Sequence, residues 1–92
     1  MERTDYERAI TQLQAAAELA VSGLPEDQRM NVMEALAFFR LRQGRIGEST
    51  VPLTSNDELF KDSAIAALTL AGRKEFLAAI ALLDQARAML SK

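Results

Sequence analysis

The residues best suited to chemistry in this sequence are arginines that stand close together near the middle of the chain. Arg42 and Arg45 are three residues apart, a spacing that lets both side chains project together from the end of a helix. The planar guanidinium group binds a carboxylate or phosphate through two parallel hydrogen bonds, and hydroxyl side chains follow shortly afterwards. The sequence therefore permits a site for a small anionic ligand or a nucleotide, formed by Arg40, Arg42, Arg45, Thr50, Thr54 and Ser55.

The same arginines also have a structural explanation. They stand on either side of Gly44, where the sequence predicts the end of a helix. Positive side chains at a helix C-terminus are stabilised by the helix dipole, by about 0.3–1 kcal/mol each. A glycine-rich phosphate loop would need a strand before it and a lysine after it, and the sequence has neither here. The pattern is compatible with anion binding and with a structural role.

Catalytic chemistry is restricted by two missing residue types. The sequence contains no histidine and no cysteine, which removes the commonest general base and metal ligand and the strongest side-chain nucleophile. Glu34 and Asp84 stand beside apolar residues and could be desolvated, but each also has an ordinary place on a helix surface and no motif joins them. We therefore expect no catalytic residues, no cofactor and no metal site, and a protein that is not an enzyme.

Aromatic and sulfur-containing side chains gather in one segment. Phe38 and Phe39 follow closely on Met30 and Met33, whose flexible thioethers suit irregular contacts. Neighbouring residues point about 100° apart on a helix, so both rings are difficult to bury in a small bundle, and we expect one of them to meet a partner chain. Burial of both in the core is the simpler alternative. The predicted protein-binding surface has Met30, Met33, Phe38 and Phe39 as apolar anchors and Arg42 and Arg45 as orienting charges at its rim.

Helical signals place these residues in the fold. Thr4 and Glu7 have the spacing of a capping box at a helix start, and Gly23 can take the left-handed conformation that ends a helix. Pro25 suits the first turn of the next helix. The predicted helices cover residues 4–22, 25–43, 56–71 and 74–90.

The predicted helix at 25–43 carries apolar residues around most of its circumference instead of one stripe. It should therefore be the central helix of the fold, or bury part of its surface against another chain. A long loop follows it, in which Pro52 disfavours helical geometry at the preceding residue. Ser55 and Glu58 then repeat the capping-box spacing, so we expect the third helix to begin at Asn56.

Gly72 interrupts an otherwise continuous helical pattern from Asn56 to Leu90. An uninterrupted helix would be longer than the roughly 8–20 residues usual in globular proteins, and it would extend beyond the other helices. We therefore predict an all-α fold in a single domain, residues 1–92. It would be a compact bundle of four helices, or three if Gly72 is not a break, with a long loop between helices 2 and 3.

Composition limits the partners. The chain has 92 residues, 49% of them hydrophobic, and a net charge of −2, which is a globular composition without the basic excess typical of nucleic-acid binding. Its longest apolar run, at 76–83, is far shorter than the roughly 20 residues that a membrane helix needs. We expect neither nucleic acid nor a membrane as partner, and a soluble cytoplasmic protein.

Two segments resemble halves of a tetratricopeptide repeat. In LTLAGRKEFLAAIALLDQARAML, a glycine turn precedes Ala79, Leu83 and Ala86, which have the small-large-small spacing of that repeat's packing helix. The first half of the repeat is similar to the segment LAFFRLRQGRIGES, in which Leu36 and Gly44 stand at about the expected interval. The resemblance implies a groove that binds a peptide or protein, as in small secretion co-chaperones.

These patterns favour a non-enzymatic protein-interaction module, such as a small adaptor, chaperone or inhibitor, that forms a homodimer through the helix at 25–43. One alternative is a binder of a small anion or nucleotide that uses the arginines and the loop at 44–55. Another is a degenerate tetratricopeptide-like hairpin with a co-chaperone role.

Overall fold

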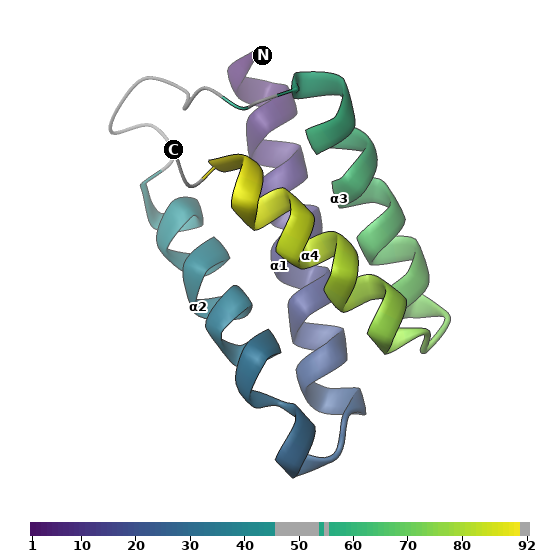
Figure 1. Cartoon of the computed structure of the whole chain (residues 1–92). Helices are drawn as coiled ribbons and strands as arrows, with labels where there is room; N and C mark the ends of the chain where they lie inside the picture. The colour runs from purple at the N-terminus through teal and green to yellow at the C-terminus, as the bar shows by residue number, and fades with distance from the viewer. Residues whose placement is uncertain (46–53, 55, 91–92) are drawn as a thin grey trace.

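The computed structural model describes residues 1–45, 54 and 56–90. These residues form four α-helices and one short 3-10 helix, with no strand in the described part of the chain, so the prediction of an all-α, four-helix bundle is confirmed (Figure 1). The elements are α1 (Arg3–Gly23), η1 (Glu26–Gln28), α2 (Met30–Gly44), α3 (Asp57–Gly72) and α4 (Phe76–Leu90). Within the described ranges, no helix combines the length and the apolar character that crossing a bilayer requires.

Helix α1 lies at the centre of the bundle. It packs against all three other helices, with α2 and α3 on either side of it and α4 across it (Figure 1). Helices α1 and α3 run in the same direction, since the rings of Tyr6 and Phe60 stack 6.4 Å apart and Lys61 Nζ lies 3.7 Å from the Asp5 carboxylate. Helix α2 occupies the edge beside α1 and also contacts α4. A central position for the second helix, the first of the two alternatives, is therefore wrong.

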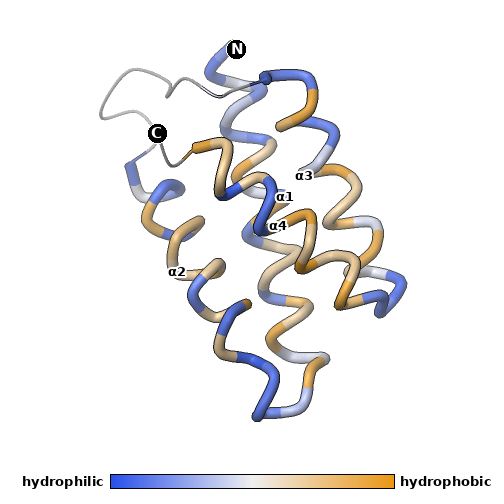
Figure 2. Tube along the Cα trace, in the orientation of Figure 1, coloured by the Kyte–Doolittle hydropathy of each residue, from blue (hydrophilic) through white to orange (hydrophobic). Residues whose placement is uncertain are grey.

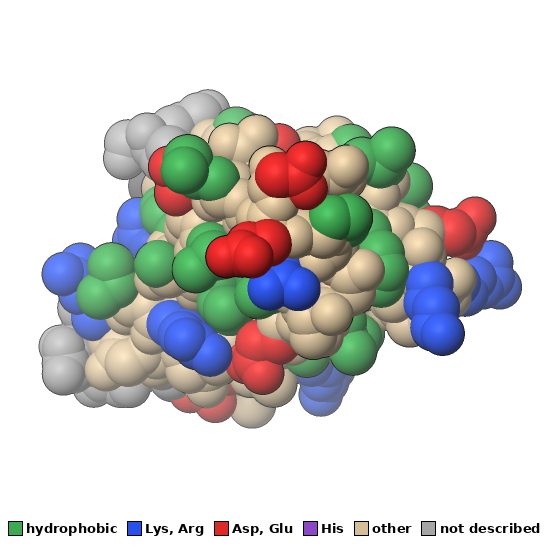
Figure 3. All heavy atoms as spheres, turned by 90° about the horizontal axis from the view of Figure 1, so that it is seen from below, with side chains coloured by type: hydrophobic (Ala, Val, Ile, Leu, Met, Phe, Trp, Pro, Cys, Tyr) green, Lys and Arg blue, Asp and Glu red, His purple; other side chains and the backbone are tan. Residues whose placement is uncertain are grey.

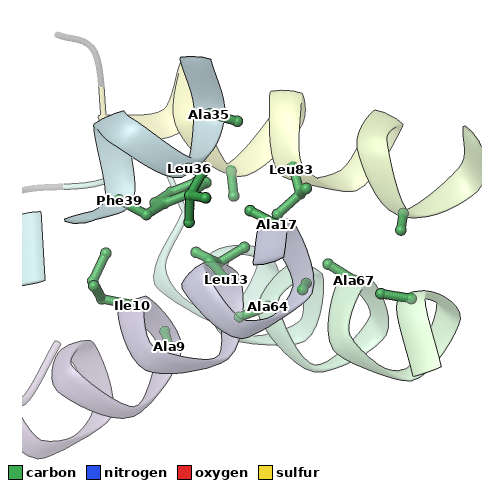
Figure 4. Packing of buried hydrophobic residues seen from close by; sticks show 14 of the residues in the cluster. Ala9, Ile10, Leu13, Ala17, Ala35, Leu36, Phe39, Ala64, Ala67 and Leu83 are labelled. Carbon is green, nitrogen blue, oxygen red and sulfur yellow. The ribbon is translucent and has the colours of Figure 1, made fainter. Parts of the chain in front are cut away.

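Small residues allow the helices to approach closely around α1. The side chains of Ala64 and Ala67 on α3 are fully buried, and Ala17 of α1 lies near Leu83 of α4 (Figure 4). The one buried polar side chain in the described part of the chain, Ser63, accepts a 2.8 Å hydrogen bond from Gln85 Nε2. The buried apolar residues of α1 are Tyr6, Ala9, Ile10, Leu13, Ala16, Ala17 and Ala20.

The beginning and end of α1 differ from the prediction. The helix begins at Arg3 after Glu2, without a side-chain cap, so the capping box of Thr4 and Glu7 is not formed. Gly23 is inside the helix and is not left-handed. Its missing side chain leaves room for Phe76 of α4 instead, because a Cβ atom there would overlap the end of that ring.

The starts of α2 and α3 are also shifted. Pro25 precedes η1, whose Gln28 N–H donates to the Pro25 carbonyl at 2.9 Å, and only then does α2 begin, at Met30. The turn between α1 and α2 is hydrophilic, whereas α4 is largely hydrophobic (Figure 2). Helix α3 begins at Asp57, where Asn56 is the cap and its Oδ1 accepts from the Leu59 N–H at 3.1 Å. Ser55, the expected cap, lies outside the described residues.

The predicted break at Gly72 is confirmed, but glycine is not the residue that makes the turn. The N–H groups of Lys74 and Glu75 donate to the carbonyls of Ala71 and Leu70, at 3.1 and 2.9 Å. These are the two bonds of a Schellman motif, which needs a left-handed residue just after the helix. Lys74 fills that position with φ of 64°, while Gly72 is the last residue of α3.

Moving glycine to the left-handed position should stabilise the protein. A left-handed conformation costs a residue with a Cβ roughly 1–2 kcal/mol, and glycine's greater freedom in the unfolded chain offsets part of the gain. We expect Lys74→Gly to raise the free energy of unfolding by about 0.5–1 kcal/mol, measured by urea denaturation followed by circular dichroism. Gly72→Ala can be measured alongside it, since an alanine Cβ at that position would meet no atom within 4 Å. A loss of stability in Lys74→Gly would contradict the turn described here.

Candidate functional site

Four side chains form an exposed apolar line along α2. The exposed fractions of Met30, Met33 and Leu41 are 74%, 54% and 63%, and Ala37, also exposed, lies between the last two. Their spacing of three, four and four residues keeps them on one face of a helix. We call Met30, Met33, Ala37 and Leu41 the α2 stripe.

The opposite face of α2 belongs to the core. Val32, Ala35, Leu36 and Phe39 are buried there, and Leu36 and Phe39 point toward Leu13 of α1 (Figure 4). The apolar residues that surround this helix are thus divided between a buried face and an exposed one. Because α2 lies at the edge of the bundle, its exposed face has no covering helix among the described residues.

Hollows on both sides of the α2 stripe extend the surface. A groove of about 700 Å³ is lined by Met33, Ala37 and Leu41 of the stripe together with Val21, Leu36 and Arg40. A second hollow of about 490 Å³ is lined by Glu26, Met30, Met33, Glu34 and Ala37. Seen from the end of the bundle, hydrophobic side chains lie at the surface among charged ones (Figure 3). Met33 and Ala37 line both hollows, so the stripe has Arg40 on one side and Glu26 and Glu34 on the other.

The two adjacent phenylalanines have different environments. Phe39 is 0% exposed, so the expectation that it anchors a partner is corrected: its ring is enclosed between α2 and α1. Phe38 is half-buried, and its ring meets that of Phe39 edge-on, with centroids 5.3 Å apart. Of the predicted apolar anchors, Met30, Met33 and Phe38 are accessible.

Arg42 does not simply point into water. Its guanidinium carbon lies 4.9 Å from the centroid of the Phe38 ring, and that of Arg87 lies 5.3 Å from the same centroid. Both distances are typical of cation–π contacts. The structure thus joins Arg42 to a residue of α4 that sequence spacing could not indicate, while Arg40 and Arg45 are exposed.

The residues of the alternative anion site are only partly described. Thr50 and Ser55 lie outside the described residues. The Thr54 hydroxyl donates a short hydrogen bond to the Asp57 carboxylate. This bond, followed by the hydrogen bond from the amino group of Met1, lowers the pKa of Asp57 below its ordinary value of 3.8. The Thr54 hydroxyl therefore already has a hydrogen-bond partner at the start of α3.

The two carboxylates considered for acid–base chemistry are at the surface. Glu34 and Asp84 are both exposed, on α2 and α4. Among residues 1–45, 54 and 56–90, no three acidic side chains lie close enough together to hold a metal ion.

The single tyrosine reports on the position of Arg42. Burial raises the pKa of the Tyr6 hydroxyl above its ordinary value of 10.0, and the charge of Arg42 opposes part of that rise. We therefore expect Arg42→Ala to raise the pKa of Tyr6 further. The measurement is the ultraviolet absorbance of tyrosinate against pH, which is specific because the chain has one tyrosine and no tryptophan.

Arg40→Ala is the matched control for this titration, because Arg40 is exposed on the same helix; it should leave the pKa of Tyr6 unchanged. The pKa of Tyr6 is higher in the folded protein than in the unfolded chain. The stability that the neutral Tyr6 hydroxyl contributes is therefore fully present below pH 10.0, and it is lost as the pH rises through the folded pKa. Equal shifts in the two variants would show that Arg42 is not beside Tyr6.

Met30 and Met33 could be predicted from the sequence as surface residues, whereas Ala37 and Leu41 were not among the predicted site residues. Their helical spacing from Met33 was a visible signal, but it could not show which apolar face of the helix packs against α1. Ala79, Leu83 and Ala86, the residues that resemble a repeat's packing helix, are all fully buried on α4.

No protein-family model, curated protein or solved structure matches this chain.

Proposed function

We propose that the protein is a non-enzymatic protein-interaction module that acts as a homodimer through α2. The observation that supports this most strongly is the α2 stripe, three of whose side chains are more than half exposed on a helix at the edge of the bundle. Large apolar side chains in one line on a protein surface mark interaction sites more often than isolated ones do. A role as an adaptor, chaperone or inhibitor would use the same face.

The charges beside the stripe suit such a surface. Protein interfaces commonly have an apolar centre with a polar rim. Here Met33 and Ala37 lie in the middle, Glu34 borders one side and Arg40 the other. Phe38, held under Arg42, would add a partly exposed aromatic ring at the margin.

The direct test is light scattering or sedimentation equilibrium on the pure protein over a range of concentrations. We expect a dimer that dissociates on dilution. A strict monomer at high concentration would contradict the homodimer.

A charge placed in the stripe should weaken association. Met33→Glu would bury the new carboxylate twice in a symmetric interface, so we expect the dissociation constant of the dimer to rise at least about tenfold. The fold should be retained, because Met33 is 54% exposed.

Leu77→Glu provides the matched control. Leu77 is 78% exposed on the first turn of α4 and lines neither of the two hollows beside the α2 stripe. It should leave the dissociation constant unchanged. An equal effect of the two substitutions would move the interface away from the stripe.

A further inference from the structure

The charges along α2 and the turn before it differ between the two ends. Toward the N-terminal end stand Glu26, Asp27 and Glu34, all exposed. Toward the C-terminal end, the charged residues up to Arg45, where this described segment ends, are all basic: Arg40 and Arg45 are exposed and Arg42 is half-buried on Phe38.

One basic residue stands at the acidic end. Arg29 is half-buried, and its Nε donates a 2.8 Å hydrogen bond to the Leu24 carbonyl. It holds the turn between α1 and η1 and is turned toward the chain itself. The exposed charge of this surface therefore changes sign from one end to the other.

This polarity restricts how two copies can pair through α2. A parallel arrangement would bring the acidic ends together and the basic ends together, and like charges facing each other oppose association. An antiparallel arrangement brings the acidic end of each copy to the basic end of the other. It also sets the two helix dipoles antiparallel, so that the positive end of each helix lies near the negative end of the other.

The α2 stripe has a natural midpoint for such a pair. Ala37 is four residues from Met33 on one side and four from Leu41 on the other. It is the smallest side chain of the stripe, so two helices can come close there. In a symmetric pair, a contact from residue i to residue j is repeated from j to i.

We infer that two copies pair through antiparallel α2 helices around a two-fold axis at Ala37, so that Met33 of each copy packs beside Leu41 of the other. The inference rests on the proposed homodimer and adds its geometry. The groove lined by Ala37, Arg40 and Leu41 then receives the Met33 side chain of the second copy, in the way that a knob enters a hole between two helices.

Single cysteines test this geometry cleanly, because the chain has none of its own. Met33→Cys and Leu41→Cys are made as separate proteins, one of them with a size tag. They are mixed in reducing buffer, allowed to exchange and then oxidised. A disulfide needs Cα atoms within about 7 Å, so only residues that face each other are joined.

We expect the mixed disulfide between the two variants to exceed either homodisulfide by at least about tenfold. Ala37→Cys should crosslink to itself, whereas Met30→Cys should not, because Met30 lies far from the axis. The dimer is confirmed independently by light scattering before oxidation, and circular dichroism checks that each variant is folded.

The outcomes separate the geometry from the proposed function. Homodisulfides of Met33→Cys and of Leu41→Cys within a dimer would overturn the antiparallel inference in favour of parallel pairing. A dimer without the mixed disulfide would also overturn it, while the proposed homodimer stands. A protein that is monomeric by light scattering would overturn both.

Discussion

Phe39→Ala is expected to lower the free energy of unfolding by about 3–5 kcal/mol, the range for removing a buried aromatic ring. The ring is 0% exposed and is among the largest fully buried side chains of the protein. It joins the edge helix α2 to the central helix α1, near Ile10 and Leu13 (Figure 4). Its removal would leave a cavity at the point where α2 is held to the bundle. Urea denaturation at one fixed protein concentration, followed by circular dichroism, measures the loss.

Phe38→Ala is the matched comparison, with the same chemical change one residue earlier. Its ring is half-buried and contacts two guanidinium groups, so we expect a smaller loss of about 1–2 kcal/mol, from part of the burial and the cation–π contacts. Equal losses in the two variants would contradict the assignment of Phe39 to the core and of Phe38 to the surface.

Ala64→Leu is expected to destabilise the protein by about 1–3 kcal/mol, the usual effect of forcing extra methylene groups into a packed core. Ala64 is 0% exposed on α3, and Ala9 of α1, which lines a small hollow with Lys61 and Ile65 of α3, is 2% exposed. Small side chains on both helices allow α1 and α3 to lie close together. A leucine would have to push the two helices apart or adopt an unfavourable rotamer.

The comparison for this substitution is Ala81→Leu on the exposed side of α4. Since leucine and alanine are both good helix formers, we expect a change within about 0.5 kcal/mol. Thermal denaturation of the two variants gives the same contrast. A tolerated leucine at position 64 would mean that α1 and α3 are not closely packed.

Much of the fold could be predicted from local signals. The hydrophobic period, the prolines and the break near Gly72 placed four helices, and three of them both begin and end within two residues of the prediction. The details of the turns could not be predicted in the same way. Gly23 was expected to end a helix by its backbone freedom, but in the structure the Phe76 ring of α4 occupies the space that a side chain there would need.

The candidate site was only half visible in the sequence. The apolar residues around most of the second helix predicted either a central position or burial against another chain, and Met30 and Met33 were among them. The choice between Phe38 and Phe39 depended on the direction from which α1 approaches. Arg87 of α4 contacts the Phe38 ring, although the two residues are far apart in the chain.

By itself, the sequence determined the helical class and the absence of histidine and cysteine chemistry, and it limited the helices to four, or three if Gly72 were not a break, because these depend on residue type and on short-range spacing. The tertiary structure decided which helix is central, which face of α2 is left at the surface and which phenylalanine is buried. Those features depend on how the helices share a common core, and that is a property of all their packing surfaces together. A helix with two apolar faces can bury either one. Here α1 packs against the face of α2 that carries Phe39, so the α2 stripe is exposed.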